Sequence, residues 1–447
     1  MIDVRTRIHD AFAIEFKLGF LPDGDGRQAD FTVGMWMFLP DSLDINASTY
    51  PKDAFYRDLK SNVRLITPEF SLDAIVSGDA VPLRNVLDAP EGEYEHRLKM
   101  MTAIARCSIR DKSQELAESD EDPRWFCDRV WEILQAYDRL REGEARESCR
   151  EFLCNTAIHQ SCKILEKRPD TPLVEDLIRR IDALSASLGY ERIDTAHPDS
   201  RYVYRQGVLK KYVEHHLWLK APKKRDGVLA EQAYFSIAAG MAMIFATVVA
   251  WAFQRTFGNL TWPLFIALII SYMMKDRIKE LMRYYFSHRV GSRYFDRKAI
   301  ISYKDRKLGY LKESCDFVDK ARVPAKVLEV RNDGRRFAPS MRAQGEKVLL
   351  YRKKVRVDAE ALSEGRTYKY SGVNDITRIQ MGSFLLKMDN PTSLVEAVDD
   401  AGCIVMVDCP KDYHINIVLQ CVCGDAEEFT HFRVTLARDG IQSIVKI

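Results

Sequence analysis

Residues 234–274 read YFSIAAGMAMIFATVVAWAF, then QR, then TFGNLTWPLFIALIISYMM, and this stretch decides how the chain is organised. Each apolar run continues for about twenty residues without a charged side chain, which is the length of a membrane-spanning helix. At 1.5 Å per helical residue, such a run extends over roughly 30 Å, the thickness of the hydrocarbon core of a bilayer. The sequence therefore predicts a transmembrane helical hairpin over 234–274, with two spans.

Basic side chains flank the hairpin on both sides. Lysines and arginines are concentrated in 201–225 and again in 275–297, whereas the connection between the runs carries only Arg255. Because basic flanks stay on the cytoplasmic side of a membrane, both termini are predicted to be cytoplasmic. We expect the following residues at the membrane surface, where each favours anionic lipids by about 1 kcal/mol: Lys210, Lys211, Lys220, Lys223, Lys224, Arg225, Lys275, Arg277, Lys279 and Arg283.

Two other interpretations of the apolar runs remain open. The runs are compatible with buried helices of a large soluble core, or with a re-entrant hairpin that does not cross the bilayer. Aromatic residues favour a hairpin that crosses the bilayer. Trp251 and Trp262 lie at the outer end of the hairpin, where an aromatic belt forms at the membrane surface. Apolar positions also continue beyond the second run, which predicts one long helix over 260–287.

Alanine recurs every four residues along the first run, at Ala238, Ala242, Ala246 and Ala250. Small residues at this spacing allow the backbones of two membrane helices to approach closely. The stripe therefore predicts a close helix contact, either with the second run of the same chain or between the subunits of a homo-oligomer.

The segments EQAYFSIAAGMAMIFAT (231–247) and SYMMKDRIKELMRYYF (271–286) resemble a recurring family of uncharacterised bacterial membrane proteins with two helices. The resemblance is confined to this central stretch. It implies a location in the bacterial inner membrane, and it implies no activity, cofactor or catalytic residue.

The region before the hairpin changes from strand to helix patterns. Strict alternation of apolar residues at 12–20 and 31–39 predicts two strands joined as a hairpin, in a β-rich α/β module over 1–90. From there, apolar residues spaced by three and four predict a helical bundle over 91–200, including a helix at 144–167.

After the hairpin, apolar and polar residues alternate again. This pattern predicts an all-β domain, a sandwich or a barrel, over 298–447. The segments 201–233 and 275–297 are predicted to be a basic juxtamembrane helix and a basic helical stem. The fold class is therefore predicted as α+β with a transmembrane helical hairpin over 234–274. The strands expected after the hairpin are Lys298–Tyr303, Lys347–Val357, Arg378–Lys387, Cys403–Asp408, Tyr413–Cys423, Phe429–Leu436 and Ser443–Ile447.

The chain lacks the sequence motifs of common enzymes. It contains no GxxxxGK[ST] phosphate loop, no GxSxG nucleophile elbow and no HExxH zinc motif. The net charge of +2 does not suggest a nucleic-acid partner. We therefore predict no catalytic residue, no cofactor and no metal site.

Cysteine and histidine positions also favour structural roles. Alternation places Cys421 and Cys423 on the apolar face of a strand, where cysteine acts as a small hydrophobic residue. In the helix at 144–167, Cys149, Cys154, His159 and Cys162 are spaced so that they spread around the helix, which prevents one metal ion from contacting all four.

Three hypotheses of function follow. We favour a non-enzymatic inner-membrane protein whose cytoplasmic parts act in sensing, scaffolding or as an effector, as a homo-oligomer that contacts lipid and cytoplasmic protein partners. The second is an oligomeric effector that perturbs the membrane by forming a pore. The third is a membrane-bound enzyme acting on lipid or nucleotide substrates, with dispersed candidates such as His96, His159 or His414.

Overall fold

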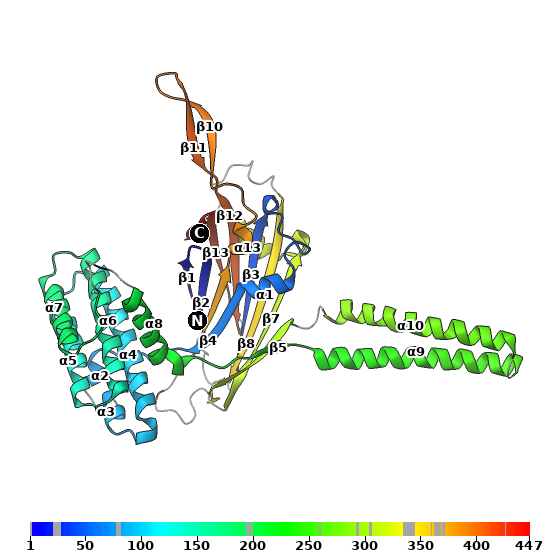
Figure 1. Ribbon diagram of the computed structural model, residues 1–447, viewed down its shortest axis with the longest axis horizontal. Helices are drawn as coiled ribbons and strands as arrows, with labels where there is room; N and C mark the ends of the chain where they lie inside the picture. The colour runs from blue at the N-terminus through cyan, green and yellow to red at the C-terminus, as the bar shows by residue number, and fades with distance from the viewer. Residues whose placement is uncertain are drawn as a thin grey trace.

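The computed structural model describes residues 2–20, 28–76, 82–193, 197, 200–258, 261–291, 295–303, 306–333, 345–358, 360–361, 368, 372–424 and 426–447. Helices and strands both contribute large parts of this mixed structure. Figure 1 shows a body of β-strands in the middle, a group of helices on one side of it, and a two-helix arm that projects from the other side.

The helical part follows the apolar periodicity of the sequence. Its helices are α2 (Asp73–Val76), α3 (Pro82–Leu87), α4 (Glu91–Glu118), α5 (Arg124–Ala136), α6 (Glu144–Lys167), α7 (Pro172–Ser187) and α8 (Ser200–Glu214). The predicted helix at 144–167 is confirmed at both ends. Helix α6 packs against α4, α7 and α8, and the buried side chains Leu98, Leu153 and Ile181 show that the apolar faces meet inside this group.

Sheet A is antiparallel, with the order β1-β2-β9-β4 among the described strands. Its strands are β1 (Ile2–Asp10), β2 (Ala13–Phe20), β4 (Leu59–Leu65) and β9 (Val373–Gln380). Along β2, Ile14, Phe16 and Leu18 lie in the core, so the intervening Glu15 and Lys17 lie on the opposite face of the sheet.

Sheet B is also antiparallel, with the order β14-β13-β12-β3-β8-β7-β6-β5 in the part of the chain that is described. Its strands are β3 (Gln28–Pro40), β5 (Lys223–Arg225), β6 (Arg297–Tyr303), β7 (Arg306–Val318), β8 (Glu346–Asp358), β12 (Tyr413–Cys423), β13 (Ala426–Ala437) and β14 (Gly440–Lys446).

The two sheets enclose a shared hydrophobic core. The ring of Phe16 in β2 lies 5.9 Å from that of Phe432 in β13, and the ring of Phe20 stacks at 5.0 Å on that of Phe31 in β3. All four side chains are almost completely buried. Aromatic residues of this size supply a large buried area, which holds the sheets face to face.

The strand pairing differs from the predicted arrangement of modules. The hairpin expected between 12–20 and 31–39 is not formed, because β2 pairs with β1 and β9 while β3 pairs with β8 and β12. Strands from 1–90 and from 298–447 therefore share both sheets instead of forming separate β modules. Alternation identifies which face of a strand is buried, but it does not identify the neighbouring strand.

Smaller elements complete the body. Helix α11 (Ala325–Asp333) packs on the outer face of sheet B, where Val327 joins a second cluster with Trp36 and Phe38. Strands β10 (Thr392–Val398) and β11 (Ile404–Pro410) form a separate hairpin that projects from one end of the body (Figure 1). Among the described residues there are also the short helices α1 (Lys52–Asp58) and α13 (Gly382–Leu385), and the 3-10 turns Asp41–Leu43, Tyr137–Arg139, His215–Leu217 and Lys320–Arg322.

Candidate functional sites: apolar arm and basic junction

The arm consists of two antiparallel helices, α9 (Val228–Phe257) and α10 (Trp262–Gly291). The two helices pack on each other through small residues. Ala238 and Ala242 are buried between them, and the hydroxyl of Ser271 donates a hydrogen bond to the carbonyl of Ala246 at 3.3 Å. The alanine stripe therefore lies against the second helix of the same chain, with Ala250 half-buried near the tip.

Large apolar side chains cover the rest of the arm. They are exposed on both helices: Ile237, Met243, Ile244, Val248, Trp251, Trp262, Phe265, Ile266, Ile270 and Met273. Soluble proteins rarely expose a continuous apolar surface of this extent, so such a surface marks contact with lipid or with another protein.

The two helices of the arm differ in apolar length. Among the described residues, α9 is the one helix that is long and apolar enough to cross a membrane by length and composition. The predicted run beginning at Thr256 is divided by the turn, because Thr256 and Phe257 complete α9 and α10 begins at Trp262. The uncharged part of α10 then ends at Met274, after about 20 Å of helix. The helix itself continues to Gly291, which agrees with the long helix predicted over 260–287.

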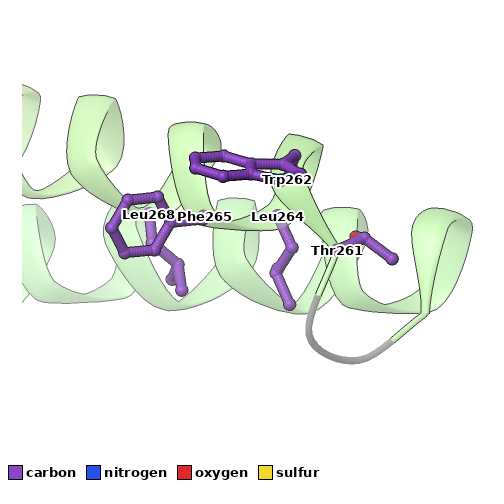
Figure 2. Close-up of a pocket in the computed structure, with 5 residues that line it drawn as sticks. All are labelled: Thr261, Trp262, Leu264, Phe265 and Leu268. Carbon is purple, nitrogen blue, oxygen red and sulfur yellow. The ribbon is translucent and has the colours of Figure 1, made fainter.

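A shallow apolar pocket of about 350 Å³ lies at the tip of the arm. Figure 2 shows that α10 supplies most of its lining, with Thr261 at the edge. The lining residues are Thr261, Trp262, Leu264, Phe265 and Leu268. Because the lining is almost entirely hydrocarbon, this pocket provides a surface for apolar chains and no group that performs chemistry.

The basic residues flanking the arm occupy different environments. Lys275 lies over the ring of Tyr272 at 3.7 Å, and Arg283 lies over Phe235 at 5.0 Å, both on the surface of the arm. Lys223, expected at the membrane surface, instead extends into the body, where its Nζ lies 2.9 Å from Glu313. Lys210 and Lys211 lie on α8, on the other side of the sheets from the arm (Figure 1).

The remaining expected surface positions lie close to the body or along α10. Arg225 pairs with Glu231 at the start of the arm at 2.9 Å, and Arg277 pairs with Glu280 at 3.1 Å. Lys224 is exposed within β5, and Lys220 is exposed shortly before that strand, whereas Lys279 is half-buried on α10.

A buried ion cluster joins sheet A to sheet B. Lys353 of β8 is buried, and its ammonium contacts the carboxylate of Asp375 in β9 and lies 3.8 Å from that of Glu313 in β7. The hydroxyl of Tyr351 donates a hydrogen bond to Glu313 at 2.9 Å. Burial by itself would raise the pKa of Glu313, but Lys353 and Lys223 hold it below its ordinary value. Two carboxylates and two ammonium groups thus face one another inside the core, where burial still raises the pKa of Asp375 despite its contact with Lys353.

Both ends of the arm are attached to this body by polar contacts. Asp226 and Asp296, which lie just outside the two arm helices, are joined by a backbone hydrogen bond of 3.3 Å. The carboxylate of Asp296 also accepts hydrogen bonds from Lys52 and from Tyr56, each at 2.9 Å, and from the backbone of Cys315 at 2.8 Å. The arm is therefore anchored at a fixed point of sheet B.

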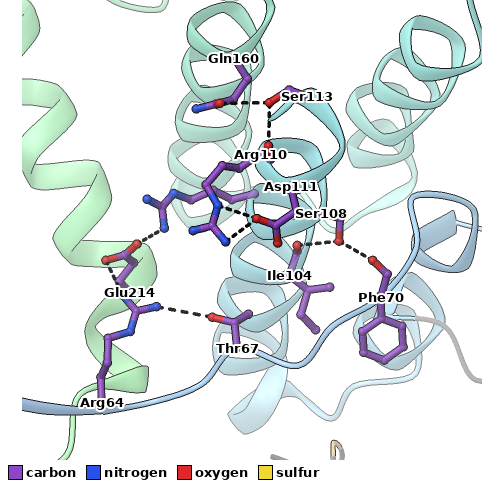
Figure 3. A network of polar contacts seen from close by, with 11 residues as sticks. Arg64, Thr67, Phe70, Ile104, Ser108, Arg110, Asp111, Ser113, Gln160 and Glu214 are labelled. Carbon is purple, nitrogen blue, oxygen red and sulfur yellow. Dashed lines mark hydrogen bonds and ion pairs between the residues drawn. The ribbon is translucent and has the colours of Figure 1, made fainter. Parts of the chain in front are cut away.

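A second polar cluster lies where sheet A meets the helical part, and we call it the basic junction. It is formed by Lys17 of β2, Arg64 of β4, Arg106 and Arg110 of α4, and Lys210 of α8. Figure 3 shows Arg64 and Glu214 meeting between the sheet and the helices, with Arg110 close by.

The carboxylate of Glu214 contacts two of the arginines in the basic junction. Glu214 is buried, lies 3.3 Å from Arg64, and also contacts Arg106. Arg64 in turn donates a hydrogen bond of 3.5 Å to Thr67, while Arg110 pairs with its neighbour Asp111 at 2.7 Å. Glu214 therefore neutralises only part of the positive charge that is gathered here.

The two lysines of the basic junction make no direct ion pair with the described acids. Within the described residues, no carboxylate lies within 4.0 Å of the ammonium group of Lys17 or Lys210. Partial burial lowers the pKa of Lys17, and Arg64 and Arg110 lower it further. Desolvation likewise lowers the pKa of Lys210, although its side chain still contacts solvent. Lys17 therefore lies in a positive local potential, whereas Glu214 offsets part of the positive charge around Lys210.

The remaining sequence candidates do not converge. His96, His159 and His414 lie on α4, α6 and β12 respectively. No group of three or more His, Cys, Asp or Glu residues suited to a metal ion occurs in the part of the chain that the structure describes. Cys149, Cys154 and Cys421 are buried, whereas Cys162 is exposed.

The basic junction was not anticipated from the sequence, because its residues come from four distant segments. Lys210 was expected at a membrane surface, and Lys17 is a single polar position within an alternating strand. The alternation did place Lys17 on the face opposite the core, but the covering of that face by α4 and α8 is a tertiary feature. Comparison of the chain with protein-family models, curated proteins and solved structures found no match.

Proposed function

We propose that the protein is anchored in a bacterial inner membrane by the arm, while the body and the helical part act in the cytoplasm in sensing, scaffolding or as an effector. The observation that carries this proposal is the projecting helix pair with large apolar side chains exposed on its surface. Water would be an unfavourable environment for this surface, since each exposed square ångström costs about 25 cal/mol relative to burial.

A crossing hairpin is compatible with the unequal apolar lengths of the two helices. The contact between Ala246 and Ser271 sets the register, so the charged part of α10 beyond Lys275 lies beside the beginning of α9. The contact of Arg283 with Phe235 shows the same register. The length that is apolar on both helices is then about 20 Å, the uncharged length of α10, which is about 10 Å less than a bilayer core. Long basic side chains such as Lys275 compensate for this difference by extending toward the headgroups.

Membrane fractionation and reporter fusions test the anchoring. We expect alkaline-washed membranes to retain the protein, and reporters fused to either terminus to show a cytoplasmic location. Ile244→Asp places a charge on the exposed apolar surface of α9 and should release the protein. Val203→Asp on α8 is the matched control, because that residue is equally exposed outside the arm. Release of the unmodified protein, or a terminus on the outer side, would contradict the anchoring.

The pore-forming alternative receives less support from the arm. A pore needs helix contacts between subunits. The face of α9 that carries the smallest side chains, including Ala238 and Ala242, is already buried within the chain. Dye leakage from liposomes that is abolished by Ala242→Leu and Ala246→Leu would nevertheless favour a pore over an anchor.

A further inference from the structure

The outer face of sheet A concentrates positive charge at a cost to the stability of the sheet. Lys17 of β2 is directly opposite Arg5 of β1 in the strand register, and Arg7 is opposite Glu15. Like charges in directly opposite positions destabilise a strand pair. On the same face, Glu15 is shared by Arg7 at 2.6 Å and Arg378 at 2.7 Å. Glu15 is thus used by two arginines, as Glu214 is in the basic junction.

Cations approach the basic junction from two independent structural units. Arg64 and Lys17 come from sheet A, whereas Arg106, Arg110 and Lys210 come from helices α4 and α8. Glu214 of α8 lies 3.3 Å from Arg64 of β4 and also contacts Arg106 of α4, and Lys210 lies one helical turn before Glu214, so the two units meet in a common region. This arrangement gathers five cations around the single carboxylate of Glu214, with no direct ion pair to either lysine among the described residues, and it becomes favourable once an anion enters.

We propose that the basic junction binds a small, multiply charged phosphate compound, with Lys17 and Lys210 contacting it from opposite sides and Arg64 and Arg110 completing the site. Guanidinium groups match phosphate oxygens in a bidentate geometry, and lysine ammonium groups bind phosphate as point charges. Binding at the junction does not depend on whether the arm crosses a membrane.

The position of the site favours a soluble ligand over a lipid headgroup or a nucleic acid. The basic junction lies on the side of sheet A that faces the helical part, whereas the arm leaves from sheet B on the other side of the body (Figure 1). A bilayer crossed by the arm would therefore lie away from the junction. Nucleic-acid surfaces extend their cations along a stripe or a helix, whereas these cations converge on one region.

Calorimetry with inorganic tripolyphosphate tests this site in the full-length protein in detergent at 150 mM salt. We expect saturable binding that weakens by about tenfold for each substitution in Lys17→Gln and Lys210→Gln, because each removes one charge-assisted contact. Lys211→Gln is the matched control, since it changes the same charge on the same helix at a neighbouring exposed position. Vesicles of phosphatidylglycerol serve as the lipid comparison.

Thermal unfolding separates a binding role from a structural role of the lysines. Without tripolyphosphate, the double variant should melt at a higher temperature than the unmodified protein, because it removes repulsion from the junction. With tripolyphosphate, its melting temperature should rise less. Absence of saturable binding, equal weakening by Lys211→Gln, or binding to the vesicles in preference to tripolyphosphate would overturn the assignment.

Discussion

His216 links the stability of the fold to pH. Its two ring nitrogens are buried and have no hydrogen-bond partner among the described residues, and its ring lies 5.3 Å from that of His96. Burial lowers the pKa of His216 to about 3, with smaller contributions from His96, Lys99 and Arg64. An unfolded histidine has a pKa near 6.5. Between this pH and about pH 3, the unfolded state therefore binds a proton at His216 that the folded state does not bind.

We therefore predict that the free energy of unfolding falls as the pH decreases from 6.5 toward 3, with the full contribution present above pH 6.5. At pH 5, His216 lowers the free energy of unfolding by about 2 kcal/mol relative to its value well above pH 6.5. His216→Phe should remove this part of the pH dependence, because it leaves no titratable group in the site. Urea unfolding at pH 8 and pH 5 measures the difference. His215→Phe, at the exposed neighbouring position, should leave the slope unchanged, and an identical slope in both variants would contradict the prediction.

At the scale of elements, Lys353 determines how sheet A is held against sheet B. Its ammonium lies between Asp375 of one sheet and Glu313 of the other, and it also contacts the hydroxyl of Ser61 in β4. Removal of the ammonium would leave two buried carboxylates with insufficient compensation. The loss of one partner from a buried pair costs about 3–5 kcal/mol.

We predict that Lys353→Met lowers the free energy of unfolding by about this amount, whereas Lys354→Met lowers it by less than about 1 kcal/mol. Lys354 is the next residue on the same strand and pairs with Asp30 at 3.1 Å on the partly exposed face. Urea unfolding in detergent measures both variants. A loss in Lys353→Met no larger than that in Lys354→Met would show that the buried cluster does not join the sheets.

The sequence predicts individual elements better than their pairing. The strand Tyr413–Cys423 and the helix over 144–167 were predicted with their observed limits, because hydrophobic periodicity is a local property. The expected strand Arg378–Lys387 is only partly correct, since β9 ends at Gln380 and the short helix Gly382–Leu385 follows. The partners of β3 are more than 300 residues away, and no local pattern identifies them.

The same distinction applies to the candidate sites. The arm is visible in the sequence because all its apolar residues are contiguous. The basic junction is not visible, because Lys17, Arg64, Arg106 and Lys210 come together only through packing of helices on a sheet. The sequence shows that Lys210 is basic, but it does not show that Glu214, one helical turn further along α8, contacts Arg64 from the sheet.

At the scale of the whole molecule, the arm is an insertion between two adjacent points of sheet B. Arg225 of β5 is opposite Arg297 of β6, and Asp226 is hydrogen-bonded to Asp296. Because the ends of the arm are this close, a tight turn can connect β5 to β6 without moving either strand. The body should therefore fold without the arm, since neither sheet includes a residue of α9 or α10.

We predict that replacing residues 228–294 with a short glycine-rich turn gives a protein that is soluble and folded without detergent. The apolar surface that requires lipid or detergent would be lost, while the sheets and the helical part keep their contacts. Size-exclusion chromatography and circular dichroism in detergent-free buffer measure the outcome. A matched control replaces 392–410, because the β10–β11 hairpin also exposes apolar residues such as Leu394 and Ile404. This control should still require detergent. If the variant that lacks 392–410 is soluble without detergent and the variant that lacks the arm aggregates, the membrane-binding surface lies on the β10–β11 hairpin and the arm has another role.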